Sequence, residues 1–305
     1  MMRFAPPATP MIVRALRRMV PALLLLLAAC HGAAPPAAHS QVALWSISQN
    51  GTPQGWILGT IHALPPGTAW RRPSIDAAMA AADRLVMEIG DPVTPEGAGA
   101  ALSRLAMTPG LPPPSARLDR AGAGALQKAY ARLGLNDARF RDQESWAVAL
   151  QLSAIASQKA GASAEDGVEP QLRARMAGKR VEGLETIDSQ FAVFDALPTA
   201  AQNRLLADVA READDPRDAD GTMLTLWLKG DELGLTHEAN SDFLGDPALH
   251  EALLAARNRA WTLTIDRMLH QGAHPFIAVG AAHVVGGDGL PTLLRGRGWT
   301  VTRVY

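Results

Sequence analysis

Residues 274–289 read HPFIAVGAAHVVGGDG. Their apolar beginning, residues 276–279, is typical of a short buried strand, and the strand pattern breaks at Gly280. His283 follows three residues later. A histidine just beyond the end of a buried strand is expected at the edge of the sheet, where open α/β sheets bind their ligands.

A second stretch, residues 55–62, repeats this order with the letters GWILGTIH. An apolar strand is followed by Gly59, two small or apolar residues and His62. If the two strands are parallel neighbours, both imidazoles lie at one sheet edge. Because glycine has no Cβ, we expect Gly59 and Gly280 to adopt φ values that turn each strand sharply, and to let a ligand approach the backbone.

A third predicted strand, residues 84–89, carries Glu88 near its end. Two histidines and one glutamate are the ligand set of catalytic zinc sites, which leave one position open for water. Such a metal lowers the pKa of its bound water and polarises a carbonyl. A single histidine in either place would more often be an ordinary partly buried residue. The duplicated context of His62 and His283 favours a site.

The other elements predict a mixed α+β or α/β fold: a small mixed β-sheet built from both chain ends, with a large helical insertion at about 94–266. Asn50-Gly51 is a hairpin signal between strands 41–49 and 55–61. Ser74 is expected to cap a helix at 75–82. Further helices are predicted at 121–133, 143–160, 166–178, 188–196, 199–212, 220–229, 247–270 and 289–296, and further strands at 180–184, 276–280 and 300–305.

The N-terminus is predicted to be a lipoprotein signal peptide, residues 1–29. It has a basic region followed by an apolar run, 20–29, that is too short for a membrane-spanning helix. The run ends in Leu-Ala-Ala-Cys, which resembles the lipobox of bacterial lipoproteins. Cys30, the only cysteine, is therefore expected to carry the lipid anchor, and residues 30–41 to form a flexible tether.

Charge and length limit the partners. Residues 1–29 contain four arginines and no acidic residue, so their removal takes the net charge from −1 to −5. A mildly acidic chain argues against nucleic acid as a partner. By the lipoprotein sorting rule, His31 in place of Asp favours the outer membrane of a bacterial cell envelope, facing the periplasm. Residues 42–305 are expected to form one domain. The sequence indicates no oligomeric state.

Five stretches of the chain resemble the TraB/GumN family: GWILGTIHALPPGTAW, ADRLVMEIGD, GKRVEGLETIDSQFAVFDALP, LLAARNRAW and FIAVGAAHVVGGDGLPTLLRGRGWTVTRV. That family is related to the Tiki metalloproteases and, more distantly, to erythromycin esterase-like and ChaN-like proteins. The resemblance covers 42–305. It implies a fold of the Tiki/erythromycin esterase/ChaN type, and that the two GxxH motifs, with Glu88 as the signature acid, mark the site.

The resemblance also implies a cofactor and further site residues. The Tiki relatives imply a divalent metal, with manganese or cobalt favoured and zinc possible, and a peptide or other small substrate. Arg257 and Asn258 match a family Arg-Asn pair that would reach a substrate carboxylate or oxyanion. The alternative is a helix-surface arginine and an ordinary polar contact. Glu169 and Glu185 match family positions and are expected to orient or cap helices.

Three functions remain open. In the first, His62, Glu88 and His283 hold a metal whose bound water attacks a peptide or amide carbonyl. In the second, which the esterase relatives imply, one histidine oriented by Glu88 activates water without a metal. In the third, the chain is a non-catalytic, peptide-binding regulatory lipoprotein. The identity of the substrate is not indicated.

Overall fold

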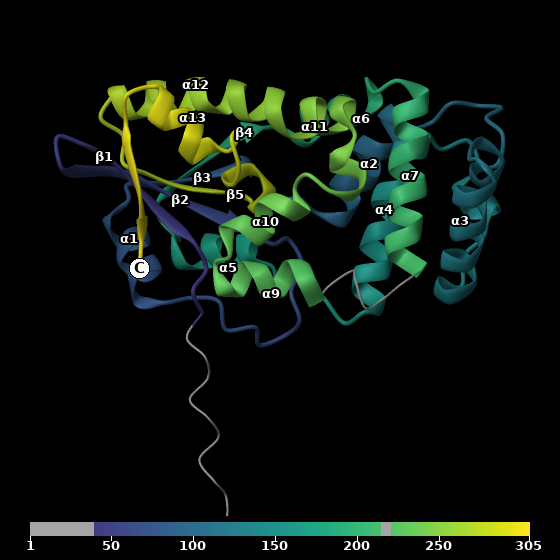
Figure 1. Cartoon of the computed structure of the whole chain (residues 1–305), viewed down its shortest axis with the longest axis horizontal. Coiled ribbons are helices and arrows are strands. Elements are labelled where there is room, and N and C mark those ends of the chain that lie inside the picture. Colours follow the sequence, from purple (N-terminus) through teal and green to yellow (C-terminus); the bar gives the residue numbers. More distant parts are fainter. Residues whose placement is uncertain (1–39, 215–220) are drawn as a thin grey trace, which may run out of the picture. The chain divides into compact units, whose positions relative to one another are not determined.

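Six strands form one mixed sheet in the order β4-β3-β5-β2-β1-β6 (Figure 1). The chain contributes β1 (Leu44–Gln49), β2 (Thr52–Thr60) and β3 (Arg84–Ile89) from its beginning, β5 (Pro275–Gly280) and β6 (Thr300–Val304) from its end, and β4 (Arg180–Glu185) from the helical insertion. The prediction of a mixed sheet assembled from both chain ends is confirmed.

The computed structural model describes residues 40–214 and 221–305. The predicted signal peptide, Cys30 and most of the tether lie outside these described residues. Within the two described ranges, no helix combines the length and the apolar character needed to cross a membrane.

Strand pairing brings the two GxxH motifs together. β2 and β5 are parallel neighbours, with Thr60 opposite Gly280, and β3 runs parallel to β5 on its other side. β1 and β2 form the predicted antiparallel hairpin. Its turn uses Asn50 and Gly51, which have φ values of 51° and 79°, as an Asn-Gly hairpin turn requires. The carboxyl ends of β2, β3 and β5 therefore lie side by side.

The described helices are α1 (Pro73–Ala81), α2 (Pro95–Leu105), α3 (Arg120–Leu133), α4 (Ser145–Lys159), α5 (Val168–Arg175), α6 (Ile187–Asp195), α7 (Thr199–Asp214), α9 (Gly221–Lys229), α10 (Glu232–Glu238), α11 (Pro247–His250), α12 (Ala256–His270) and α13 (Leu290–Gly296). Each predicted helix is present with small shifts at its ends, and two further helices, α2 and α10, were not predicted. The predicted helix at 247–270 is interrupted by a π-helical turn, η4 (Glu251–Ala255).

One predicted cap is wrong. Helix α1 begins one residue before Ser74, at Pro73, because proline is well suited to the first helical turn. The N-cap position belongs to Arg72, whose side chain donates from Nη1 to the hydroxyl of Ser74. The serine therefore fixes an arginine side chain instead of capping the helix.

Two hydrophobic clusters form the interior. The first surrounds the sheet and includes the fully buried strand β5 together with residues of α1, α5, α12 and α13. A central parallel strand that is covered on both faces is expected to be apolar throughout. The second cluster lies among α3, α4 and α7 of the insertion, which Figure 1 shows beside one another. The strands that lead to the two histidines, β2 and β5, belong to the first cluster.

Candidate active site

The three signature side chains meet around Gly280. A Cβ placed on this glycine would lie 3.1 Å from Glu88 Oε1, 3.6 Å from His283 Cδ2 and 3.8 Å from His62 Nε2. His62 stands two residues beyond β2, Glu88 lies near the end of β3, and His283 lies in the 3₁₀-helix η5 (Ala281–Val284) after β5. The parallel pairing of these strands thus brings together residues from opposite ends of the chain.

The two glycines serve close packing, not a sharp turn. Neither Gly59 nor Gly280 has a positive φ, so the predicted turning role is wrong. A Cβ on Gly59 would come within 2.7 Å of Val284 Cγ2 and 3.2 Å of Ala281 Cα, which shows how tightly η5 lies on β2. A side chain on Gly280 would fill the space that the three site residues share.

Glu88 is held as a buried carboxylate. Its Oε1 accepts a hydrogen bond from the Gly280 backbone N–H at 2.7 Å, and its Oε2 accepts from Gln190 Nε2 at 3.0 Å and from Arg257 Nη2 at 3.1 Å. Burial opposes ionisation. At the acid pH where Glu88 titrates both histidines are protonated, and their charges with that of Arg257 outweigh burial and lower the pKa of Glu88 to about 2. The carboxylate is therefore ionised at neutral pH.

His283 is held in one neutral tautomer. The side-chain amide of Asn258 donates from Nδ2 to the carbonyl of Asp288 at 2.8 Å, so its Oδ1 faces His283 Nδ1 at 2.6 Å. Nδ1 must then carry the hydrogen, which leaves a lone pair on Nε2. Arg257 Nη1 donates to this Nε2 at 3.2 Å, and Glu88 Oε1 lies 3.9 Å from it. Burial lowers the pKa of His283 to about 4.

His62 has a different partner. Its Nδ1 donates to Glu169 Oε1 at 2.7 Å, and the Thr60 hydroxyl donates to the same oxygen at 2.5 Å. The Glu169 carboxylate raises the pKa of His62 to about 10. The imidazole side chain is 68% exposed while its Nε2 faces Gly280. His62 is therefore the solvent-facing, positively charged member of the site.

Glu169 was predicted to orient or cap a helix. It does not cap α5, but its carboxylate ties this helix to the loop after β2. Helix α5 begins after Gly167 without a side-chain cap. A Cβ on Gly167 would lie 2.1 Å from the His62 carbonyl oxygen, so only glycine permits this approach of α5 to the loop. Because Thr60 and His62 both donate to Glu169, the insertion fixes the position of the first histidine. The Thr-x-His pattern at the strand end was the available signal for this contact.

Arg257 was predicted to contact a substrate, but in this structure its donors bind groups of the protein. Nε and Nη2 donate to the Glu185 carboxylate at 2.9–3.3 Å, and Nη1 also donates to the Leu253 carbonyl at 2.9 Å. The remaining contacts are those to Glu88 and His283. Glu185 therefore does not cap a helix: it pairs with the buried Arg257.

A metal ion does not fit these residues as they are arranged. Within residues 40–214 and 221–305, no group of three or more His, Cys, Asp or Glu side chains is placed to hold a metal ion. The Arg257 guanidinium, a cation of the protein itself, contacts both the Glu88 carboxylate and His283 Nε2. A positive charge therefore already faces two of the three predicted ligands. The divalent metal stays a prediction.

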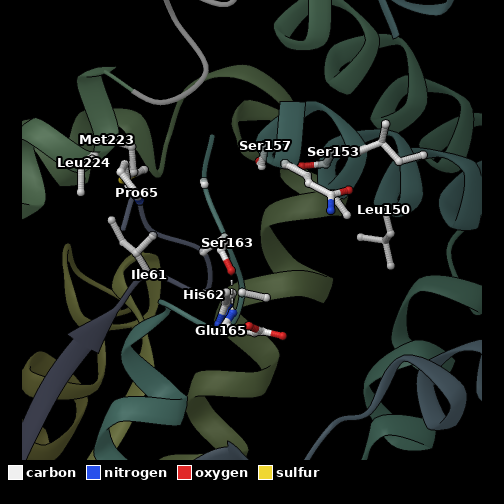
Figure 2. Close-up of a pocket in the computed structure, with 16 residues that line it drawn as sticks. Ile61, His62, Pro65, Leu150, Ser153, Ser157, Ser163, Glu165, Met223 and Leu224 are labelled. Atoms are coloured by element: carbon white, nitrogen blue, oxygen red, sulfur yellow. Dashed lines mark hydrogen bonds between the residues drawn. The ribbon is translucent and has the colours of Figure 1, made fainter. Parts of the chain in front are cut away.

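His62 also borders a cavity of about 940 Å³. Figure 2 shows labelled side chains of α4 on one side of the open space and those of α9, with Pro65, on the other. His62 lines this cavity, whereas Glu88 and His283 are buried and are not among its described lining residues.

The family model for TraB/PrgY/gumN matches residues 43–303. The chain belongs to this family. It is also similar to YbaP, an uncharacterized protein, of Escherichia coli strain K12 and of Shigella flexneri, with 30% identity over 172 residues in each case. The match covers 56% of this chain and 63% of each relative, so it spans less than two thirds of their length. No solved structure matches this TraB/PrgY/gumN protein significantly. The predicted family membership is confirmed.

Proposed function

We propose that this protein hydrolyses a peptide, amide or ester bond at the point where His62, Glu88 and His283 face Gly280. The observation that carries the proposal is the unlike partnering of the two histidines. His62 Nδ1 is bonded to a carboxylate, whereas His283 Nδ1 is bonded to a neutral amide. One imidazole is thus kept charged and the other neutral beside Gly280. A general acid and a general base at one site need such different protonation states.

The roles follow from these charges. The attacking water occupies the space above Gly280, beside Glu88 Oε1. As its oxygen adds to the carbonyl carbon, its proton passes to the Glu88 carboxylate. The neutral Nε2 of His283 becomes a second acceptor when it releases its hydrogen bond from Arg257 Nη1. The imidazolium of His62 stabilises the oxyanion and then donates a proton to the leaving nitrogen or oxygen as the bond breaks. The pKa values of about 4 and about 10 keep His283 neutral and His62 protonated at neutral pH.

A metal-dependent form of the same hydrolase is the second candidate. Its support is the resemblance of the sequence to the Tiki metalloproteases and the His/His/Glu residue set that this resemblance implies. The contact of the Arg257 guanidinium with Glu88 and His283 favours the metal-free form, since the guanidinium supplies the positive charge that a metal would bring.

The two forms are separated by one screen. The purified domain, residues 40–305, is incubated with a peptide mixture and with acyl esters in EDTA, and then with manganese, cobalt or zinc. We expect cleavage in EDTA, loss of cleavage in His62→Ala and His283→Ala, and normal cleavage in the control His237→Ala, an exposed histidine of α10. Cleavage that EDTA abolishes and manganese or cobalt restores would establish the metal-dependent form. Peptide binding without cleavage under every condition would indicate the regulatory lipoprotein.

We also propose that the protein is a lipoprotein of the bacterial cell envelope, anchored through Cys30. The support is the lipobox-like sequence that ends at this residue. In cells that express the whole chain, wild-type protein should label with a fatty acid and sediment with membranes. Cys30→Ser should do neither, and a sedimenting, labelled variant would contradict the anchor.

A further inference from the structure

The cavity beside His62 has apolar walls from two separate hydrophobic clusters. Partly buried side chains that pack against the sheet cluster form one wall, and partly buried side chains of α4 that pack against the helical cluster form the other. The principal apolar members are Ile61, Pro65, Leu150, Ile155, Met223 and Leu224. Figure 2 shows these walls facing each other across the open space. An apolar group placed between them would contact both clusters.

The charges of the cavity are few. Among its described lining residues, only His62 and Glu165 carry ionisable side chains, and no lysine or arginine takes part. Ser153, Ser157 and other neutral polar groups complete the lining. Among the residues that the structure describes around the cavity, an anionic group would meet the Glu165 carboxylate and find a cation only in His62, which is already paired with Glu169. The lining thus disfavours acidic ligands.

We propose that this cavity is the specificity subsite of the enzyme and binds a neutral, apolar side chain or acyl chain next to the scissile carbonyl. This inference rests on the proposed hydrolytic function. With His62 at its border, an apolar group in the cavity brings the adjacent carbonyl to the imidazolium. A volume of about 940 Å³ exceeds the needs of one side chain, so the subsite takes long aliphatic or aromatic groups.

Two series of substrates test the subsite. They also distinguish whether its natural ligand is the apolar side chain of a peptide or the acyl chain of an ester. One is a set of blocked peptides with Gly, Ala, Val, Leu, Phe or Asp on the acyl side of the cleaved bond. The other is a set of p-nitrophenyl esters with acyl chains of two to eight carbons. We expect kcat/KM to rise about threefold to fourfold for each buried methylene, as the transfer energy of a methylene predicts. The Asp peptide should be the poorest peptide substrate. The series in which kcat/KM rises with each methylene identifies whether the subsite serves peptides or acyl esters.

Variants link the preference to the cavity. Ser153→Trp, on the exposed face of α4, should fill the space and reduce kcat/KM for the longest substrates at least tenfold, with little effect on the Gly peptide or the acetyl ester. Ser103→Trp makes the same change at an exposed position of α2 and should alter neither series. Glu165→Lys should raise cleavage of the Asp peptide selectively. A flat dependence on chain length, or an unchanged gradient in Ser153→Trp, would refute the subsite.

A binding measurement keeps this inference separate from the hydrolytic proposal. His62→Ala protein is titrated with dansyl-labelled Leu, Gly and Asp peptides and with dansyl-labelled octanoyl amide, and fluorescence anisotropy is recorded. Tighter binding of the Leu or octanoyl probe by at least tenfold, abolished by adding Ser153→Trp but not Ser103→Trp, supports the subsite even where no cleavage is seen. Equal affinities for all probes would overturn it whatever the catalytic result.

Discussion

Replacing Arg257 with methionine would remove a cation while keeping much of the side chain's length and apolar volume. The Arg257 side chain is only 10% exposed and pairs with two carboxylates, those of Glu88 and Glu185. Its loss leaves both acids buried without their partner. Breaking a buried ion pair by removing one member costs about 3–5 kcal/mol. We therefore expect the free energy of unfolding of Arg257→Met to fall by about that amount.

Arg259 on the same helix provides the matched control. It pairs with Glu251, and these side chains are 54% and 57% exposed. Solvent screens an exposed ion pair, so Arg259→Met should lose far less stability than Arg257→Met. Urea denaturation of both variants at pH 7, followed by circular dichroism, measures the difference. Equal losses in the two variants would refute the account of Arg257 as the cation that compensates the buried acids.

Three further predictions concern the site. Glu169→Gln should lower the pKa of His62, measured by NMR titration, by about 1–3, the usual effect of one nearby opposite charge, with solvent exposure favouring the smaller value; an unchanged pKa would disprove the pairing. Gly280→Ala should reduce kcat more than tenfold with little change in thermal stability, because its methyl group would occupy the space beside Glu88. Full activity in this variant would show that the attacking water does not use that space. Because His283 has its pKa lowered from 6.5 to about 4, its contribution to stability is complete above pH 6.5 and is lost as pH falls through 4. The loss should be about 3 kcal/mol by pH 4 in urea titrations, and His283→Gln should lack it; an identical pH dependence in this variant would contradict the assignment.

The sequence was sufficient to predict the sheet and the convergence of its ends. An apolar strand, a glycine and a histidine occur in the same order at 55–62 and at 274–289. Because the carboxyl ends of parallel strands lie at one edge of a sheet, this repetition predicted that the two histidines meet. Glu88 was found in the same way, from its place near the end of β3. Short-range patterns were enough here because each strand carries its site residue within a few positions of its own end.

Contacts across the insertion could not be predicted. Glu169 lies 107 positions from His62, and in sequence it looks like an ordinary acid in the first turn of a helix. The approach of Gly167 to the His62 carbonyl oxygen and the backbone bridge between Leu64 and Ser163 bring the two together. Arg257 likewise matched a substrate-binding role, since nothing in its own surroundings in the sequence reveals that Glu185 will lie opposite it. Such pairings depend on how helices pack, which local patterns do not encode.

The most direct test of the site is the protonation state of its two histidines in one sample. Nitrogen-15 NMR of the imidazole rings, with peaks assigned from His62→Gln and His283→Gln, reports both charge and tautomer. The account predicts that at pH 7 His283 is neutral with its hydrogen on Nδ1 and stays so down to about pH 4, while His62 remains charged up to about pH 10. Two histidines that both titrate near pH 6.5 would contradict it.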